Sequence, residues 1–259
     1  MQLPKLTNKQ QEIILLTPKF RFLTTNQIQQ FLNHKNKKTI NTWLKNLRDN
    51  DFLEWDFDPK EFREKNKPAA YHIGINGIRF VKTKGVPSQI IQKLYRDNKR
   101  GDDFIYRCLL LTNIGLELRA KSNRDAAYSV TTNTDLDYQD SIFNFLKDLS
   151  PQLVFIKKQK GKKYYRLLEI FDPILPQRAI KRRIRQYFEF LLSGEWEDNI
   201  SKTLPTVLFI CPSLSILISL KRFTKRLLED ENAENLDISF ATVNEVKKYG
   251  VIAEVWEGI

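Results

Sequence analysis

A short basic segment, residues 35–48, is the feature that most restricts how this chain can fold. Its apolar residues fall at i, i+3, i+4 and i+7, the spacing of a single stripe along an α-helix: Ile40, Trp43, Leu44 and Leu47. Polar and basic residues are left to face away from that stripe: Lys37, Lys38, Asn41, Thr42, Lys45 and Arg48. Such donors suit phosphate oxygens and base edges, although a mixed polar face is also usual for a surface helix.

Two shorter helices are predicted before this segment. Thr7 with Gln10, and Thr24 with Gln27, have the spacing of a capping box, and Pro18 is expected to end the first helix after residues 9–16. Three short helices cannot each be stable alone, so they must share one small core. The expected members of that core are Leu15, Leu23, Ile28, Leu32, Trp43 and Leu47.

After the third helix the periodicity changes from 3.6 to 2. Residues 52–57 alternate as a strand, and residues 71–73 are typical of the strand that returns beside it. The loop between the two strands carries four basic side chains: Lys60, Arg63, Lys65 and Lys67. Three helices followed by a hairpin with a basic loop predict a winged helix, and that fold favours nucleic-acid contact over a merely solvated third helix.

The net charge of +12 is concentrated in two blocks. Residues 1–100 carry 20 Lys and Arg against 9 Asp and Glu, and residues 151–193 carry 11 against 3. The segments 101–150 and 194–259 are acidic overall. Two separated basic blocks predict a polyanion bound along defined patches, and double-stranded DNA is the first candidate.

Membrane association and cysteine chemistry are not predicted. No apolar run approaches the length of a membrane span, and the first ten residues lack the apolar core of a signal peptide, so we expect a cytoplasmic protein. Neither basic block is an amphipathic helix with exposed aromatic residues, which disfavours an anionic membrane as the partner. Cys108 and Cys211 lie far apart in apolar runs without a CxxC spacing, so we expect buried, inert thiols and no metal site.

A polar, glycine-containing segment at residues 97–103 predicts a domain boundary, giving a winged-helix domain over 1–98 and a second domain over 99–259. The second domain alternates between the two periodicities. Helices are expected at 104–120, 141–149, 178–192 and 214–228, and strands at 126–131, 153–158, 164–171, 207–211, 237–242 and 251–256. This order predicts a mixed α/β sheet with helices on its faces, and an α/β (α+β overall) chain.

The strand pair over 153–171 and the helix after it resemble the core of PD-(D/E)XK nucleases. In that core one acid begins a strand, and an acid and a lysine two residues apart lie on the next strand, where they hold Mg²⁺ and position a water. Here Gln152 stands in place of the first acid and Phe171 in place of the lysine. Glu169 fits the pattern, whereas Asp172 comes one residue late.

Two substitutes for the missing groups are conceivable from the sequence. Lys181, on the following helix, could replace the lysine, and Asp135 or Asp137 could approach Glu169. Helix capping and a turn explain the two aspartates equally well. The sequence therefore predicts a degenerate, pseudonuclease site without a cofactor, and Mg²⁺ enters only if a displaced site cleaves DNA.

The whole arrangement resembles the replication-relaxation family of plasmids and other mobile elements. The matching pieces are TTNQIQQFL and TWLKNLRDNDFLE in the first half, and SPQLVFI, YRLLEIFD, RIRQYFEFL and LPTVLFICPS in the second. The resemblance implies an N-terminal winged helix joined to a restriction-endonuclease-like domain. The family's Pro-Asp is replaced by Pro151-Gln152, and its Glu-x-Asp pair becomes Glu169 with the late Asp172.

A second DNA-binding patch is predicted in the second domain. The helix at 178–192 has an apolar face and, opposite to it, a basic stripe at i, i+3, i+4 and i+7: Arg178, Lys181, Arg182 and Arg185. The turn between the strands at 153–158 and 164–171 adds Lys160, Lys162 and Lys163, and the first of these strands ends with Lys157 and Lys158. Crowded charges of one sign repel each other, which favours an anionic partner over a merely solvated face. DNA is the preferred partner, and an acidic protein is the alternative.

The predicted function is therefore DNA binding in the replication, transfer or transcriptional regulation of a mobile element. The expected partners are double-stranded DNA, a second copy of the chain in a homodimer, and replication, transfer or transposition proteins of the same element. Two alternatives remain open at this point. One is a metal-dependent DNA endonuclease with a displaced active site, and the other is an assembly adaptor that uses the basic patch on another protein.

Overall fold

The structure is a computed structural model that describes residues 4–56, 68–98, 100–138 and 141–259. Their contacts divide the chain into two compact units, Met1–Leu116 and Glu117–Ile259. The predicted boundary at residue 98 precedes helix α6 (Asp102–Ala120), whereas the two units divide within that helix. In the part of the chain described, no helix has both the length and the apolar character needed to cross a membrane.

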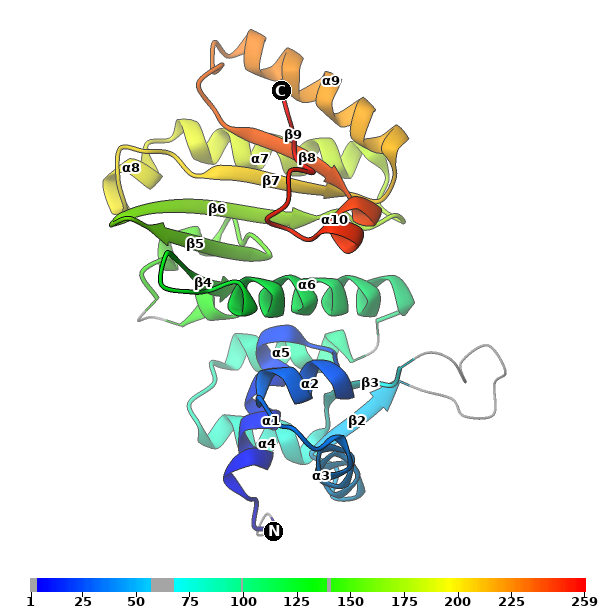
Figure 1. Ribbon diagram of the computed structural model, residues 1–259. Helices are drawn as coiled ribbons and strands as arrows, with labels where there is room; N and C mark the ends of the chain where they lie inside the picture. Colours follow the sequence, from blue (N-terminus) through cyan, green and yellow to red (C-terminus); the bar gives the residue numbers. More distant parts are fainter. Residues whose placement is uncertain (1–3, 57–67, 99, 139–140) are drawn as a thin grey trace. The chain divides into compact units, whose positions relative to one another are not determined.

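The first unit is a winged helix followed by further helices. Its elements are α1 (Asn8–Phe20), β1 (Leu23–Thr24), α2 (Thr25–Phe31), α3 (Lys37–Asp49), β2 (Leu53–Asp56), β3 (Ala70–Ile73), α4 (Ile75–Thr83) and α5 (Ser88–Asp97). The strands form a small antiparallel sheet in the order β1-β3-β2, and α3 leads directly into β2 (Figure 1). The predicted sequence of three helices and a hairpin is confirmed.

Both predicted capping boxes are present, at Thr7 with Gln10 and at Thr24 with Gln27. The prediction that Pro18 ends the first helix is wrong, because α1 continues through Pro18 to Phe20. Proline lacks the N–H that would bond the carbonyl four residues earlier. Here the Thr17 hydroxyl donates to the Ile14 carbonyl at 2.7 Å. The buried carbonyl that faces Pro18 therefore still has a hydrogen-bond donor.

The core of the first unit contains four of the six predicted members: Leu23, Ile28, Leu32 and Leu47. Trp43 is only partly buried. Leu15 is 38% exposed, so its placement in the core was wrong. Ile13 and Ile14 take that place, because the buried face of α1 runs through Gln10, these two residues and Thr17, at helical spacing.

Glycine lets α4 pack tightly against the turn after α3. A Cβ atom on Gly74 would meet the carbonyl oxygen of Asp51, and one on Gly77 would meet that of Phe52. The Gly74 N–H donates to the Phe52 carbonyl at 3.0 Å. The turn between α3 and β2 is thereby held against the start of α4.

The second unit is a mixed sheet in the order β4-β5-β6-β7-β8-β9. Its strands are β4 (Ala126–Thr132), β5 (Leu153–Gln159), β6 (Lys162–Ile170), β7 (Thr206–Cys211), β8 (Ile238–Thr242) and β9 (Glu257–Gly258). Strands β4 to β6 pair antiparallel, β6 to β8 pair parallel, and β9 is antiparallel to β8. This is the predicted mixed α/β fold.

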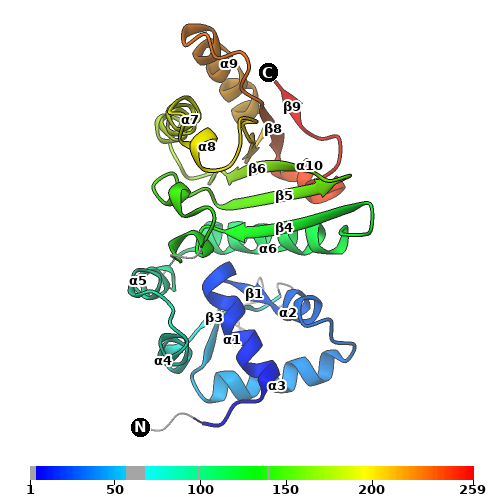
Figure 2. The ribbon, with the colours of Figure 1, turned by 90° about the vertical axis from the view of Figure 1, so that its left-hand side faces the viewer.

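Helices cover both faces of this sheet. Helices α7 (Gln177–Leu192) and α9 (Leu214–Asp230) lie on one face, and α10 (Val243–Tyr249) lies on the other (Figure 2). The short helix α8 (Glu195–Asn199) follows α7. Neither α8 nor α10 was predicted.

Two other predicted elements are wrong. The helix expected at 141–149 is only a 3₁₀ turn at Asn144–Lys147. Its buried residues Phe143, Leu146 and Leu149 recur every three residues, which is the period of a 3₁₀ helix and not of an α-helix. The strand expected at 251–256 is a turn closed by the Trp256 indole N–H, which donates to the Val251 carbonyl at 2.8 Å.

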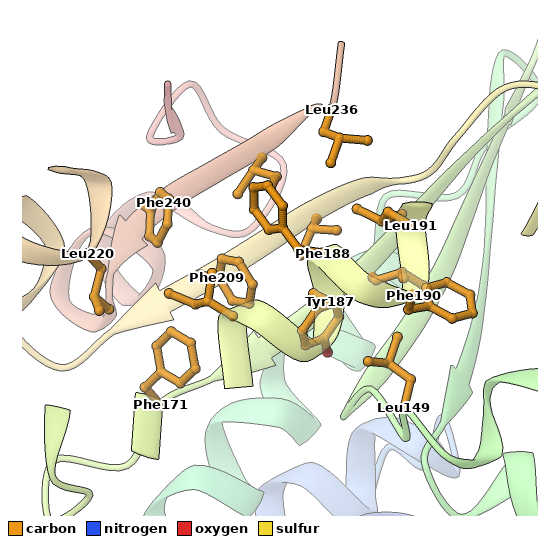
Figure 3. Packing of buried hydrophobic residues seen from close by; sticks show 14 of the residues in the cluster. Leu149, Phe171, Tyr187, Phe188, Phe190, Leu191, Phe209, Leu220, Leu236 and Phe240 are labelled. Carbon is orange, nitrogen blue, oxygen red and sulfur yellow. The ribbon is translucent and has the colours of Figure 1, made fainter. Parts of the chain in front are cut away.

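The main core lies between α7, α9 and the sheet (Figure 3). Phe171 stacks on Phe209 with ring centroids 5.2 Å apart, and Tyr187 meets Phe209 edge-on at the same distance. Cys211 belongs to this core, and Cys108 to a core cluster in the first unit. Both cysteines are buried, as predicted, and burial raises the pKa of each thiol to about 12.

Candidate nucleic-acid interface

Helix α3 presents the predicted donors on one exposed face. The helix begins after Asn36, whose side-chain oxygen accepts hydrogen bonds from the backbone N–H groups of Lys38 (2.9 Å) and Thr39 (3.4 Å). Ile40, Leu44 and Leu47 are completely buried, which fixes the rotation of the helix. The exposed side chains opposite to them are Lys37, Lys38, Asn41, Thr42 and Lys45.

Arg48 differs from the other predicted contacts. Its guanidinium carbon lies 3.7 Å from the centroid of the Trp55 ring on β2, and a terminal nitrogen lies 3.8 Å from a carboxylate oxygen of Asp49. Stacking of this kind leaves the edge of the guanidinium plane available for hydrogen bonding. Arg48 is therefore held beside the wing strands, whereas the lysines of α3 extend into solvent.

The loop of the wing cannot be compared with its prediction. Lys60, Arg63, Lys65 and Lys67 lie outside the described residues. The strands that lead into and out of it are described, and the rings of Trp55 and Tyr71 pack 5.9 Å apart across them.

A polar pocket beside the start of α3 was not anticipated. Its volume is about 390 Å³, and it is lined by Asn26, Gln29, Gln30, Asn33, His34 and Lys35. The Gln29 side chain donates to the His34 carbonyl at 2.9 Å, and the His34 ring packs against Trp43 with centroids 5.1 Å apart. Amide donors next to a helix N-terminus suit an anionic group. The run of Asn and Gln side chains over residues 26–33 is the sequence feature that could have predicted this pocket.

In the second unit, Gln152 joins the start of β5 to the end of β6. Its amide nitrogen donates to Glu169 Oε1 and to the Ile170 carbonyl, each at 3.1 Å, and its oxygen accepts from the Ile170 N–H at 3.1 Å. An aspartate has no N–H to make the first two bonds. The amide at the position of the nuclease acid therefore has a structural role.

Glu169 is also engaged on its second oxygen. Oε2 accepts hydrogen bonds from Arg183 at 2.9 Å and from the Tyr187 hydroxyl at 2.8 Å, and the residue is 8% exposed. Arg183 also donates to the Ser150 carbonyl at 3.1 Å. Both carboxylate oxygens thus accept from protein donors, and a guanidinium neutralises the charge.

The electrostatics of this cluster are consistent with a fixed ion pair. Burial lowers the pKa of the Arg183 guanidinium, but the interactions with Glu169 and Tyr187 together more than offset burial, and the pKa is raised. Burial and the negative charge of Glu169 raise the pKa of Tyr187 well above its ordinary value, so the phenol stays protonated as a donor. The cluster holds its own cation where the nuclease core would hold Mg²⁺, and the residues present do not fit that metal.

The proposed substitutes for the nuclease groups lie elsewhere. The Lys181 amine lies 5.3 Å from the Phe223 ring on α9, and Asp135 accepts from the N–H and hydroxyl of Thr132, each at 2.9 Å. Asp172 accepts from the Ile174 N–H at 3.0 Å. Among the described residues, no group of three or more His, Cys, Asp or Glu is placed to hold a metal ion.

Sequence reasoning missed Arg183. It is flanked on α7 by the buried Ile180 and Ile184 and lies four residues before the buried Tyr187, so it shares their face of the helix. A basic residue on the apolar face of a helix needs a buried partner. That mismatch was the signal that could have identified the ion pair with Glu169.

The second predicted patch consists of two separate surfaces. Lys160, Lys162 and Lys163 lie at the turn between β5 and β6, whereas α7 begins beyond the other end of β6. The nine residues of β6 span about 30 Å, so the turn and the basic first half of α7 do not meet. On α7, the exposed basic residues are Arg178, Arg182 and Arg185, and α9 adds exposed Arg222, Lys225 and Arg226.

Comparison with models of protein families and with curated protein sequences gave no match. Two solved structures show weak similarity. A variant of Lactococcus lactis ZitR is 18% identical with a TM-score of 0.26, over 39% of this chain and 66% of its own. Restriction endonuclease FokI is 14% identical with a TM-score of 0.33, over 96% of this chain and 46% of its own. The chain thus spans less than two thirds of either protein, and the fold described above rests on the order and direction of its own elements.

Proposed function

We propose that this chain binds duplex DNA through α3, with the wing beside it, and does not cleave it. The observation that carries the proposal is the exposed face of α3, where three lysines and two neutral hydrogen-bonding side chains face solvent and the single acid is Asp49, the last residue of the helix. In a winged helix this element enters the major groove. Arg48, stacked on Trp55, lies at the end of the same helix.

The basic surface on α7 and α9 supports a second contact in this proposal. Lys181 and Arg185 both lie 5.3 Å from the Phe223 ring, so part of this charge is held in place by packing. The resemblance of the sequence pieces to the replication-relaxation family points to replication, transfer or regulation of a mobile element. Sequencing the genomic DNA that is recovered with the protein tests this. Binding confined to one origin would indicate replication or transfer, and binding at several operators would indicate transcriptional regulation.

Binding to a duplex should depend steeply on salt. If about 6–8 phosphates are neutralised, the logarithm of the affinity should fall with the logarithm of salt concentration at a slope of about −5 to −7. Fluorescence anisotropy with a labelled duplex across a salt series measures this slope. A slope near zero would contradict the proposal.

The competing function is a metal-dependent endonuclease. Its acids would need free lone pairs for Mg²⁺, whereas the oxygens of Glu169 accept from Gln152, Arg183 and Tyr187. We therefore expect supercoiled DNA to remain intact after incubation with the protein and Mg²⁺ or Mn²⁺. Nicking that disappears in Glu169→Ala would establish the nuclease instead.

A further inference from the structure

A row of three side chains crosses the antiparallel strands near the β5–β6 turn. Tyr128 on β4 pairs with Lys157 on β5, which pairs with Tyr164 on β6. Directly paired residues lie on the same face of a sheet, and two strand spacings separate the tyrosines by about 10 Å. We call this row, together with Lys162 on the same face and Lys160 in the turn, the hairpin-tip surface.

The row points away from the main core. The neighbouring residues Ile156 and Tyr165 pack against that core, and the Tyr165 ring lies 5.2 Å from the Trp196 ring. Alternation along the strands turns Lys157 and Tyr164 to the opposite face. Tyr164 is 48% exposed, so packing does not account for an aromatic residue at this position.

The hairpin-tip surface is strongly basic. Residues 157–166, which form the end of β5, the turn and the start of β6, carry six Lys and Arg and no acid. On the face of the row, Lys157 is paired with Tyr164 and Lys162 lies two residues before Tyr164. An anionic partner would neutralise this charge.

We propose that the hairpin-tip surface binds an unpaired strand of DNA. Exposed aromatic rings on a sheet stack on bases, and only unpaired bases can leave their own stack to meet them. The lysines around the row would neutralise the phosphates that link those bases. This inference rests on the proposed function for the choice of DNA, and it adds a single-stranded segment to the duplex as substrate.

Anisotropy with a labelled oligo(dT) of about 15 nucleotides tests the inference. Tyr164→Ala should weaken binding about tenfold or more, as loss of a base–aromatic stack does. Tyr164→Phe, which keeps the ring, should bind like the parent. Lys162→Gln should reduce the slope of the salt dependence by about 0.7, the loss of one phosphate contact on a single strand.

The matched control is Tyr249→Ala. Tyr249 is 57% exposed on α10, and the Lys248 amine lies 4.8 Å from its ring, so it is also an exposed tyrosine beside a lysine. This substitution should leave oligo(dT) binding unchanged. Equal losses in Tyr164→Ala and Tyr249→Ala, or a loss in Tyr164→Phe, would overturn the stacking model.

Two further arms separate this inference from the proposed function. Lys38→Glu/Lys45→Glu should lose duplex binding and keep oligo(dT) binding. Tyr164→Ala should keep duplex binding and lose oligo(dT) binding. Loss of oligo(dT) binding in the α3 variant alone would place the single strand on α3 and overturn the inference. Tighter binding of oligo(U) than of oligo(dT) would overturn the choice of DNA. Thermal melts verify that each variant is folded.

Discussion

Replacing Lys38 and Lys45 together with glutamate should weaken binding to duplex DNA by at least about a hundredfold. Both side chains are exposed on α3, and neither contributes to the buried stripe of Ile40, Leu44 and Leu47. A hydrogen bond to a charged group contributes about 1.5–3 kcal/mol, so two lost phosphate contacts alone account for this factor. The two new carboxylates add repulsion. Anisotropy at fixed salt measures the change.

The matched control is Lys82→Glu/Lys84→Glu, which makes the same change in net charge on exposed lysines of α4 and the residue after it. It should cost far less affinity, because those lysines are not on α3. Arg48 is a poorer probe than the lysines, since its replacement also removes the stacking on Trp55. Equal losses in the two double variants would show that net charge, and not α3, governs binding.

Arg183→Met should destabilise the second unit by about 3–5 kcal/mol, the usual cost of leaving one member of a buried ion pair without its partner. Glu169 would keep its bonds from Gln152 and Tyr187 but lose the neighbouring cation. The Ser150 carbonyl would lose a donor as well. Hydrogen exchange of peptides from β6 and β7 in a urea series reports on this unit separately from the first.

Two variants make this result specific. Arg182→Met removes an exposed neighbour on α7 and should leave exchange unchanged. Glu169→Gln/Arg183→Met removes both charges and should lose less stability than Arg183→Met, because no uncompensated charge remains. If Arg183→Met behaves like Arg182→Met, the ion pair contributes nothing to stability.

Local patterns predicted much of this fold. The capping boxes at Thr7 and Thr24, the apolar stripe of α3 and the alternation of β5 and β6 depend on short-range spacing, which a sequence displays directly. Pro18 was misjudged because its effect depended on a side-chain hydrogen bond from Thr17. The period of three around Leu146 resembles that of an α-helix, because 3.0 and 3.6 residues per turn differ little over two turns.

The candidate sites were less predictable because they depend on distant segments. Which donors reach Glu169 is decided by the packing of α7 on the sheet, and the sequence suggested Lys181 where the structure has Arg183. The basic residues of the β5–β6 turn and of α7 are close in sequence, yet β6 holds them at opposite ends. Charge counted along a chain does not reveal that separation.

The cluster around Glu169 restricts which substitutions the second unit can accept one at a time. Gln152→Asp alone would remove the donors to Glu169 and to the Ile170 carbonyl and would place a second carboxylate beside Glu169. Removing Arg183 alone would leave a buried carboxylate without compensation. The residues of this cluster are therefore expected to change together or not at all.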